Sequence, residues 1–239
     1  TTYTKVRTYP YGQLLAHTLG YMGVISYEES ILPENASLPQ EAMVGKTGLE
    51  KSYETQLRGT YGYRMDIVND QGKVVSTPIL KQAVDGSDLW LTVDIQTQLK
   101  TEALLMEYLT DEMAGAVVVL EPTTGQIVSI ASYPTYDPNA FTLGISQEEW
   151  DALNDEDSNN PLYGRATIGM YPPGSTFKPF TAAIAMDTNT ISYDFVFKEH
   201  ISNNQWTPSD IGWAYPAITR VSETPGLLNM KNALIYSDN

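Results

Sequence analysis

The sequence contains no cysteine and only two histidines, His17 and His200. Without cysteine the chain can form no disulfide framework, no thiolate nucleophile and no Cys-ligated zinc or iron–sulfur centre. Two histidines are also too few for a His-rich metal site. We therefore expect this chain to hold no metal.

Basic residues are scarce as well: 14 Lys and Arg stand against 29 Asp and Glu, which gives a formal net charge of −15. This balance argues against generic nucleic-acid binding, which needs clustered Lys and Arg to neutralise phosphates. No apolar stretch approaches the roughly 20 residues of a membrane span, and no secretory signal pattern opens the chain.

What is present is typical of a folded protein. The 239 residues are 42% hydrophobic and 18% charged, which is ordinary globular composition, and their number allows one large domain or two smaller ones. The first residues give no sign of a natural start. The last eight, NALIYSDN, are expected to belong to a helix that is still running, because no Gly or Pro follows them. We therefore expect a fragment at both ends.

Residues 1–88 are rich in Gly, Tyr and polar residues and have no long helical period. The β-branched and aromatic content predicts three short strands, and leucine and tyrosine at four-residue spacing predict one short helix. The predicted strands lie within 18–25, 63–70 and 73–80, with a turn at 69–72 between the last two, and the helix spans 48–57. This part is expected to be an irregular α+β module.

The composition changes near residue 89, where LWLTVD predicts a strand that ends at Asp94. Asp94 is expected to cap a helix over 94–113 with Ile95, Leu99 and Met106 on its apolar face. Two apolar runs then predict a β-hairpin too apolar to leave a face in water, so we expect cover on both sides. The runs are 115–121 and 126–132, and further helices are predicted at 146–153 and 175–187. The fold class is an α+β multi-domain chain whose second part is an antiparallel sheet covered by helices.

Several sequence features suggest chemistry but have a better structural interpretation. Gly45-Lys46-Thr47 resembles the end of a phosphate-binding loop, yet Gln40 stands where that motif needs glycine, so a turn into a helix is favoured. No nucleophile-elbow sequence lies near His200, so a Ser-His-Asp triad is not indicated. Acidic runs at 148–149 and 155–157 lack the apolar flanks that raise a carboxyl pKa, so they are interpreted as solvated surface.

The segment around Ser175 and Lys178 is different. Three residues apart at the start of an apolar helix, the two side chains share one face. Gly174 is expected to allow a close backbone approach, and Pro179 is tolerated only in or near the first turn. A serine beside a buried lysine can be activated as an acyl-transfer nucleophile, and a helix N-terminus favours an oxyanion. By itself this four-residue motif occurs often by chance.

The motif does not stand alone, because Ser237-Asp238-Asn239 follows downstream. SxxK together with SDN and KTG is the joint signature of penicillin-binding proteins and class A β-lactamases. Several longer blocks then resemble class B penicillin-binding proteins, the monofunctional D,D-transpeptidases of peptidoglycan synthesis. The blocks that carry this resemblance are YPYGQLLAHTLGYMGVI (9–25), GKTGLEKSYETQLRG (45–59), LTVDIQTQ (91–98) and AVVVLEPTTGQIVSIASYPTYDPN (116–139). Residues 218–239 are closest to the low-affinity, resistance-associated branch of that family.

The resemblance implies a division into a non-catalytic, dimerisation-like pedestal (1–88), incomplete at its N-terminus, and the N-terminal part of a transpeptidase domain (89–239). It implies that Ser175 attacks the penultimate D-alanine carbonyl of a stem peptide, and that Lys178 accepts the serine proton. Ser237 would relay protons to the leaving amine, and Asn239 would hold the substrate amide. A β-lactam would acylate the same serine.

The resemblance further implies no cofactor, a glycosyltransferase partner and no nucleic-acid partner. It also implies an extracytoplasmic location at the cell membrane, with an anchor upstream of Thr1. One departure is serious: the third motif, KTG, belongs well beyond SDN, whereas the KTG here is Lys46-Thr47-Gly48 in the pedestal. We therefore expect that these 239 residues alone are not a competent transpeptidase and that the polypeptide is longer.

The same residues leave other functions open. A serine D,D-carboxypeptidase or a β-lactamase would share the chemistry, although small β-lactamases lack a pedestal. A penicillin-sensing receptor domain or a non-catalytic scaffold that binds cell-wall machinery would share the motifs without turnover.

Overall fold

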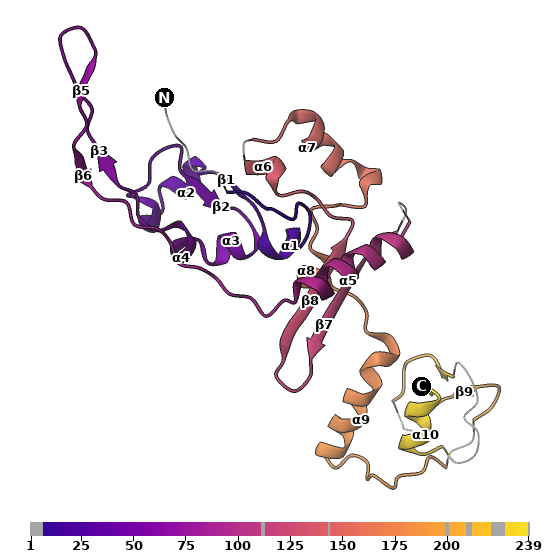
Figure 1. Cartoon of the computed structure of the whole chain (residues 1–239). Helices are drawn as coiled ribbons and strands as arrows, with labels where there is room; N and C mark the ends of the chain where they lie inside the picture. Colours follow the sequence, from indigo (N-terminus) through magenta and orange to yellow (C-terminus); the bar gives the residue numbers. More distant parts are fainter. Residues whose placement is uncertain are drawn as a thin grey trace. The chain divides into compact units, whose positions relative to one another are not determined.

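The computed structural model describes residues 7–110, 113–142, 144–198, 201–208, 212–220 and 228–238. The contacts divide the chain into two compact units, Thr1–Met170 (unit 1) and Tyr171–Asn239 (unit 2). Figure 1 gives the order of their elements along the chain.

Unit 1 begins with short elements around a two-stranded antiparallel sheet of β1 and β2. The elements are α1 (Ala16–Leu19), β1 (Met22–Val24), α2 (Tyr27–Ser30), η1 (Pro33–Asn35), β2 (Met43–Gly45), α3 (Gly48–Ser52) and α4 (Glu54–Arg58). Ile25, Ala42 and Val44 form a small buried cluster beside the sheet. The predicted strand within 18–25 is confined to β1, since its first residues belong to α1. The predicted helix over 48–57 is present but divided at Tyr53, whose φ of −114° departs from helical values.

A long hairpin follows, in which two short strand pairs succeed one another (Figure 1). β3 (Tyr63–Arg64) pairs with β6 (Ile79–Lys81), and β4 (Ile67–Val68) pairs with β5 (Val74–Ser76), each with a register shift. The predicted turn is confirmed: the Asn69 side-chain oxygen accepts hydrogen bonds from the backbone N–H groups of Gln71 and Lys73, at 3.1 and 2.9 Å.

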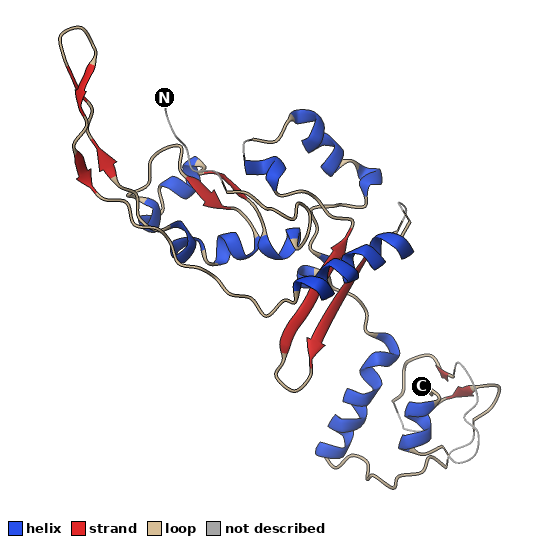
Figure 2. Ribbon diagram, in the orientation of Figure 1, coloured by secondary structure: helices blue, strands red, loops and turns tan. Residues whose placement is uncertain are grey.

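The next part of unit 1 is a helix on a β-hairpin, as predicted, although the helix ends at Tyr108 and not at residue 113. Asp94 caps α5 (Ile95–Tyr108) by accepting the Thr97 N–H at 2.8 Å, and β7 (Gly115–Glu121) pairs with β8 (Gln126–Tyr133). Figure 2 shows α5 lying across these two strands. The predicted strand over 89–94 is wrong. This segment makes two separate hydrogen bonds to β8, from Thr92 to the Ile127 carbonyl and from Asp94 to the Val128 carbonyl, and forms no ladder.

The face that α5 buries is polar, contrary to the predicted apolar stripe. Gln98 has no exposed surface, whereas Leu99 and Met106 are 41% and 39% exposed. The Gln98 amide accepts from the Ile130 N–H and donates to the Ile130 carbonyl, both at 2.9 Å, so it satisfies backbone groups of β8 that would otherwise be buried unpaired. The expectation of cover on both sides of the hairpin is also not met among the described residues, since Val118 on β7 is 43% exposed.

The remainder of unit 1 packs against its beginning. It contains α6 (Asn139–Thr142), α7 (Gln147–Asn154), η2 (Glu156–Ser158) and α8 (Arg165–Ile168). A buried cluster joins Ala16 of α1 to Tyr136 and Phe141. The predicted helix at 146–153 is confirmed as α7, which starts with a reciprocal capping box between Ser146 and Glu149.

Unit 2 contains η3 (Gly174–Phe177), α9 (Lys178–Asp187), β9 (Gln205–Trp206), β10 (Ile218–Thr219) and α10 (Met230–Ile235). The helix predicted over 175–187 is therefore present, with a 3₁₀ first turn. The helix expected to run through the last residues is wrong, because α10 ends at Ile235 and Ser237 adopts a left-handed φ of 52°. Among the described residues of unit 2, only Asp238 is buried.

Candidate active site

The SxxK motif lies at the start of α9 in a turn fixed by Gly174. Gly174 has a φ of +55°, which glycine adopts without steric cost, and a Cβ there would meet nothing within 4 Å. The reason for glycine is thus its positive φ, and the expected close backbone approach is not found among the described residues. The exposed Ser175 follows, and its carbonyl accepts the Lys178 N–H that closes the 3₁₀ turn. Pro179 occupies the first turn of α9, as predicted.

The structure brings Lys178 of the first motif onto Ser237 of the second, 59 residues away in sequence. The Lys178 Nζ donates to the Ser237 carbonyl at 2.6 Å and lies 3.3 Å from the Ser237 Oγ. Both side chains are partly buried. Ser175 lies one turn before Lys178. The Ser175 hydroxyl, the Lys178 amine and the Ser237 hydroxyl, which are groups suited to acyl transfer, therefore belong to two segments that are in contact. Asn239 and His200 lie outside the described residues.

The sequence interpretation missed Arg220, which lies against the middle residue of the second motif. Its Nε donates to Asp238 Oδ1 at 2.7 Å and its Nη2 to Oδ2 at 2.5 Å. The Asp238 side chain is 1% exposed and that of Arg220 is 11% exposed. A lone arginine 18 residues from its partner has no local sequence signal, so only the tertiary structure reveals the pair.

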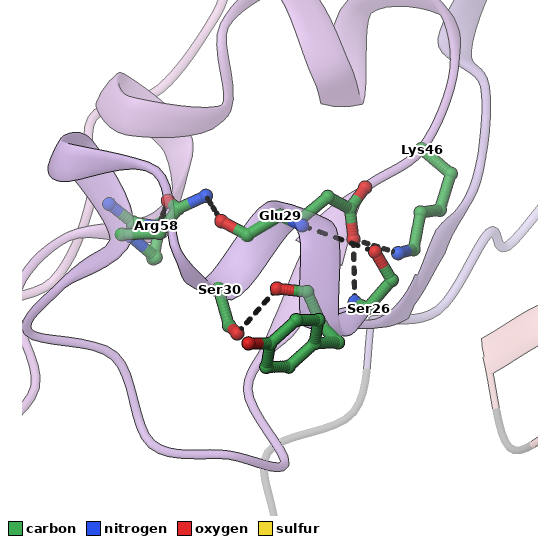
Figure 3. A network of polar contacts seen from close by, with 7 residues as sticks. Ser26, Glu29, Ser30, Lys46 and Arg58 are labelled. Atoms are coloured by element: carbon green, nitrogen blue, oxygen red, sulfur yellow. Dashed lines mark hydrogen bonds and ion pairs between the residues drawn. The ribbon is translucent and has the colours of Figure 1, made fainter.

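The Gly-Lys-Thr segment in unit 1 has the structural role that the sequence favoured. Figure 3 shows the Lys46 ammonium directed at the Glu29 carboxylate, with which it forms an ion pair. Glu29 also accepts the Ser26 N–H at 2.8 Å in the capping box of α2. The Lys46 side chain is therefore engaged in an ion pair with a residue of α2. Gly48, with a φ of +57°, starts α3, and a Cβ there would come within 2.6 Å of the Gly20 nitrogen.

Three of the blocks that carried the family resemblance interlock in unit 1. The buried Glu50 accepts hydrogen bonds from the Tyr9 hydroxyl, at 3.3 Å, and from Arg7, at 3.2 Å. Burial and the Glu50 charge raise the pKa of that hydroxyl, so it stays a donor. The backbone of Tyr9 exchanges two 2.9 Å hydrogen bonds with the Asn139 amide.

His17 belongs to the same contact region and not to the candidate site. Its Nε2 lies 2.7 Å from the Pro161 carbonyl, and its ring meets Tyr136 edge-on at 5.2 Å between centroids. Burial lowers the pKa of His17, which favours a neutral ring that donates to this carbonyl. The described residues include no group of three or more His, Asp or Glu placed to hold a metal. No described helix is long and apolar enough to cross a bilayer.

Two family models match the chain. Residues 1–91 match the penicillin-binding protein dimerisation domain, and residues 115–239 match the penicillin-binding protein transpeptidase domain. The chain belongs to the penicillin-binding protein family. Within this family it is similar to penicillin-binding protein 3 of Bacillus subtilis strain 168, with 40% identity over all of this chain and 34% of that protein. It is also 38% identical to the peptidoglycan D,D-transpeptidase MrdA of Escherichia coli K12, over 79% of this chain and 29% of MrdA.

Solved penicillin-binding proteins share the fold. Pseudomonas aeruginosa PBP2 in complex with WCK 5153 superposes on 95% of this chain with a TM-score of 0.75 and 27% identity, covering 44% of that chain. PBP2 of Helicobacter pylori in its complex with MreC gives the same TM-score and identity over 95% of this chain and 40% of that one. The chain spans about a third of the length of the curated relatives that it matches.

Proposed function

We propose that the protein is a peptidoglycan D,D-transpeptidase that works through a serine acyl-enzyme. The observation that carries this proposal is the contact between the Lys178 Nζ and Ser237, which joins two motifs of the family. The supporting comparison is the relative MrdA, named as a peptidoglycan D,D-transpeptidase.

In the proposed reaction, the Ser175 Oγ attacks the carbonyl carbon of the penultimate D-alanine of a stem peptide. Lys178 takes the hydroxyl proton, which then passes through Ser237 to the amine of the departing D-alanine as the peptide bond breaks. An acceptor amine from a second stem peptide then attacks the acyl carbon and forms a new amide, and the proton that this amine loses returns to the Ser175 Oγ as the ester bond breaks. The Ser175 N–H contributes to the oxyanion hole, and Asn239 holds the substrate amide.

The contact between Lys178 and Ser237 supports the proposed proton transfer. The Lys178 Nζ is held on Ser237 through the carbonyl and lies 3.3 Å from the hydroxyl, so a proton has a short path between the two side chains. The exposed Ser175 is accessible to a substrate from outside unit 2.

The rest of the expected biology forms part of the same proposal. We assign residues 1–88 to a pedestal and 89–239 to the transpeptidase domain, in keeping with the two family models. The location is extracytoplasmic, by resemblance to the relatives. The partners are stem peptides, β-lactams and a glycosyltransferase. A protein like MreC is a further expected partner, because the H. pylori relative was solved with MreC.

Labelling of the natural-length protein with a fluorescent penicillin tests the proposal. We expect lasting labelling of wild type, complete loss in Ser175→Ala, and no change in the matched control Ser76→Ala, an exposed serine on β5. Equal labelling of Ser175→Ala would refute the nucleophile. Rapid drug hydrolysis instead of an adduct would identify a β-lactamase, and release of D-alanine without cross-linking would identify a carboxypeptidase. Absence of labelling would favour a non-catalytic scaffold.

A further inference from the structure

Ser237 has an unusual backbone conformation for a serine. Its φ of 52° lies in the left-handed region, which residues with a Cβ adopt rarely. This conformation ends α10 and points both the carbonyl and the hydroxyl of Ser237 toward the Lys178 Nζ. A backbone of this kind persists only where surrounding contacts determine it.

Those contacts converge on the next residue, Asp238. Its backbone N–H donates to the Ala233 carbonyl at 2.8 Å, which closes the end of α10. Its carboxylate is buried, although most described side chains of unit 2 are exposed or only partly buried. Burial of a carboxylate is unfavourable unless a cation and hydrogen bonds satisfy it.

Arg220 supplies that cation with a fixed orientation. Two of its N–H groups meet the two carboxylate oxygens of Asp238, at 2.7 and 2.5 Å, so the planar guanidinium sets the direction of the carboxylate as well as neutralising it. The backbone of Arg220 is itself anchored, because its N–H donates to the Asn204 carbonyl at 2.8 Å. Arg220 follows directly on β10, which pairs with β9.

We propose that Arg220 is a positioning residue for Ser237: its two-pronged ion pair with Asp238 holds the turn that places Ser237 on Lys178. This inference rests on the proposed acyl-enzyme function. Without the guanidinium, the Asp238 carboxylate is driven toward water, and the peptide between Ser237 and Asp238 rotates with it. Lys178 then loses the partner that passes its proton on.

The test is a double-mutant cycle on the rate constant of acylation by a fluorescent penicillin, in the natural-length protein. Arg220→Met removes the charge and keeps much of the side-chain volume. We expect it to slow acylation about tenfold, a part of the 10²–10⁴-fold that a positioned proton-transfer group contributes. Arg220→Lys keeps the charge without the fork, so its rate should lie between those of Arg220→Met and wild type.

The decisive comparison is made in a Ser237→Ala background. If Arg220 acts through Ser237, Arg220→Met should slow acylation less than about twofold there, because residues that act as a unit are not additive. The matched control is Arg58→Met. It removes another largely buried ion pair, Arg58–Glu54 in unit 1, whose side chains are 12% and 15% exposed, and should leave the rate unchanged.

Intact-mass titration of the acylated fraction separates a slower reaction from a smaller amount of folded protein. Equal slowing by Arg220→Met in both backgrounds, or no slowing in either, overturns the inference. If Arg220→Met does not fold, Arg220→Lys at the wild-type rate overturns it equally. A wild-type protein that is not acylated at all refutes the proposed function instead, so the two failures are distinguishable.

Discussion

The two compact units differ in what holds their geometry. In unit 1, apolar and aromatic side chains form two buried clusters, one of which joins Ala16 and Tyr21 to Tyr136 and Phe141. In the described part of unit 2, the single buried residue is the charged Asp238, while Phe180 and Ile184 of the apolar helix α9 are 62% and 57% exposed. Apolar packing, together with buried polar groups such as Gln98 and Glu50, fixes the first region, whereas a few directed polar contacts alone fix the candidate active site.

This difference has a consequence for how each region responds to change. A packed cluster loses stability in proportion to the volume removed from it, because many small contacts contribute. An ion pair that holds one turn depends on both partners, and removal of one leaves a buried charge. Unit 1 should therefore be most sensitive to loss of apolar volume, and unit 2 to loss of charge.

The largest effect is expected from Phe141→Ala in unit 1. Phe141 is 8% exposed and stacks on Tyr21, with 4.0 Å between ring centroids. Removal of the ring should lower the free energy of unfolding by about 3–4 kcal/mol, from lost burial and the cavity left behind. Urea unfolding measures this change. The control is Tyr27→Ala, because Tyr27 is 76% exposed, and it should change the free energy of unfolding by less than about 0.5 kcal/mol. Similar costs for the two variants would remove the basis of the comparison.

An intermediate and local effect is expected from Asp238→Ala in unit 2. Arg220 would keep a nearly buried guanidinium without its carboxylate, and the end of α10 would lose its anchor. We expect opening of α10 to become easier by about 2 kcal/mol, below the range for a fully buried pair because Arg220 retains some contact with water. Hydrogen exchange of the α10 amides reports this opening. Asp194→Ala, at an exposed position, should leave it unchanged, and unaltered exchange in Asp238→Ala would contradict the polar anchoring of unit 2.

The smallest effect is a pH dependence of unit 1 through His17. Burial and the nearby Arg165 charge lower the pKa of His17 below its ordinary value of 6.5. Below pH 6.5 the unfolded chain therefore binds a proton that the folded chain does not. The contribution of His17 to stability is complete above that pH and is lost as the pH falls. Between pH 7.5 and 5.5 we therefore expect the free energy of unfolding to fall, as measured by urea unfolding.

The neutral variant His17→Gln isolates this contribution, because its amide can still donate to the Pro161 carbonyl and does not titrate. Its stability should fall less than that of wild type over the same interval. Parallel curves for the two proteins would mean that His17 does not titrate differently on folding.

The sequence predicted those features that depend on neighbouring residues. Asp94 caps α5, α7 forms where a helix over 146–153 was predicted, and the two apolar runs pair as β7 and β8, because each signal acts within a few residues. The SxxK and SDN motifs were likewise visible, and the structure brings Lys178 onto Ser237. The roles of Ser175 and Asn239 stay predictions.

Other features could not be predicted because they depend on residues distant in sequence. Periodicity selected Leu99 and Met106 for the buried face of α5, but the backbone of β8 offers polar groups there, and Gln98 satisfies them. The segment 89–94 has the composition of a strand, yet strand formation needs a continuous ladder with a neighbour. Arg220 and Asp238 meet only after the chain has folded.

The exchange of hydrogen bonds between Tyr9 and Asn139 bears on how this protein could be recombined with its relatives. Chimeras joined near residue 88 would pair the Tyr9 backbone of one parent with the Asn139 amide of another, and likewise the Ala16 carbonyl with the Tyr136 hydroxyl. Segments 7–21 and 133–142 should therefore come from the same parent, although more than 100 residues separate them in sequence. Exchanges that move both segments together should preserve folding better than those that cut the chain once.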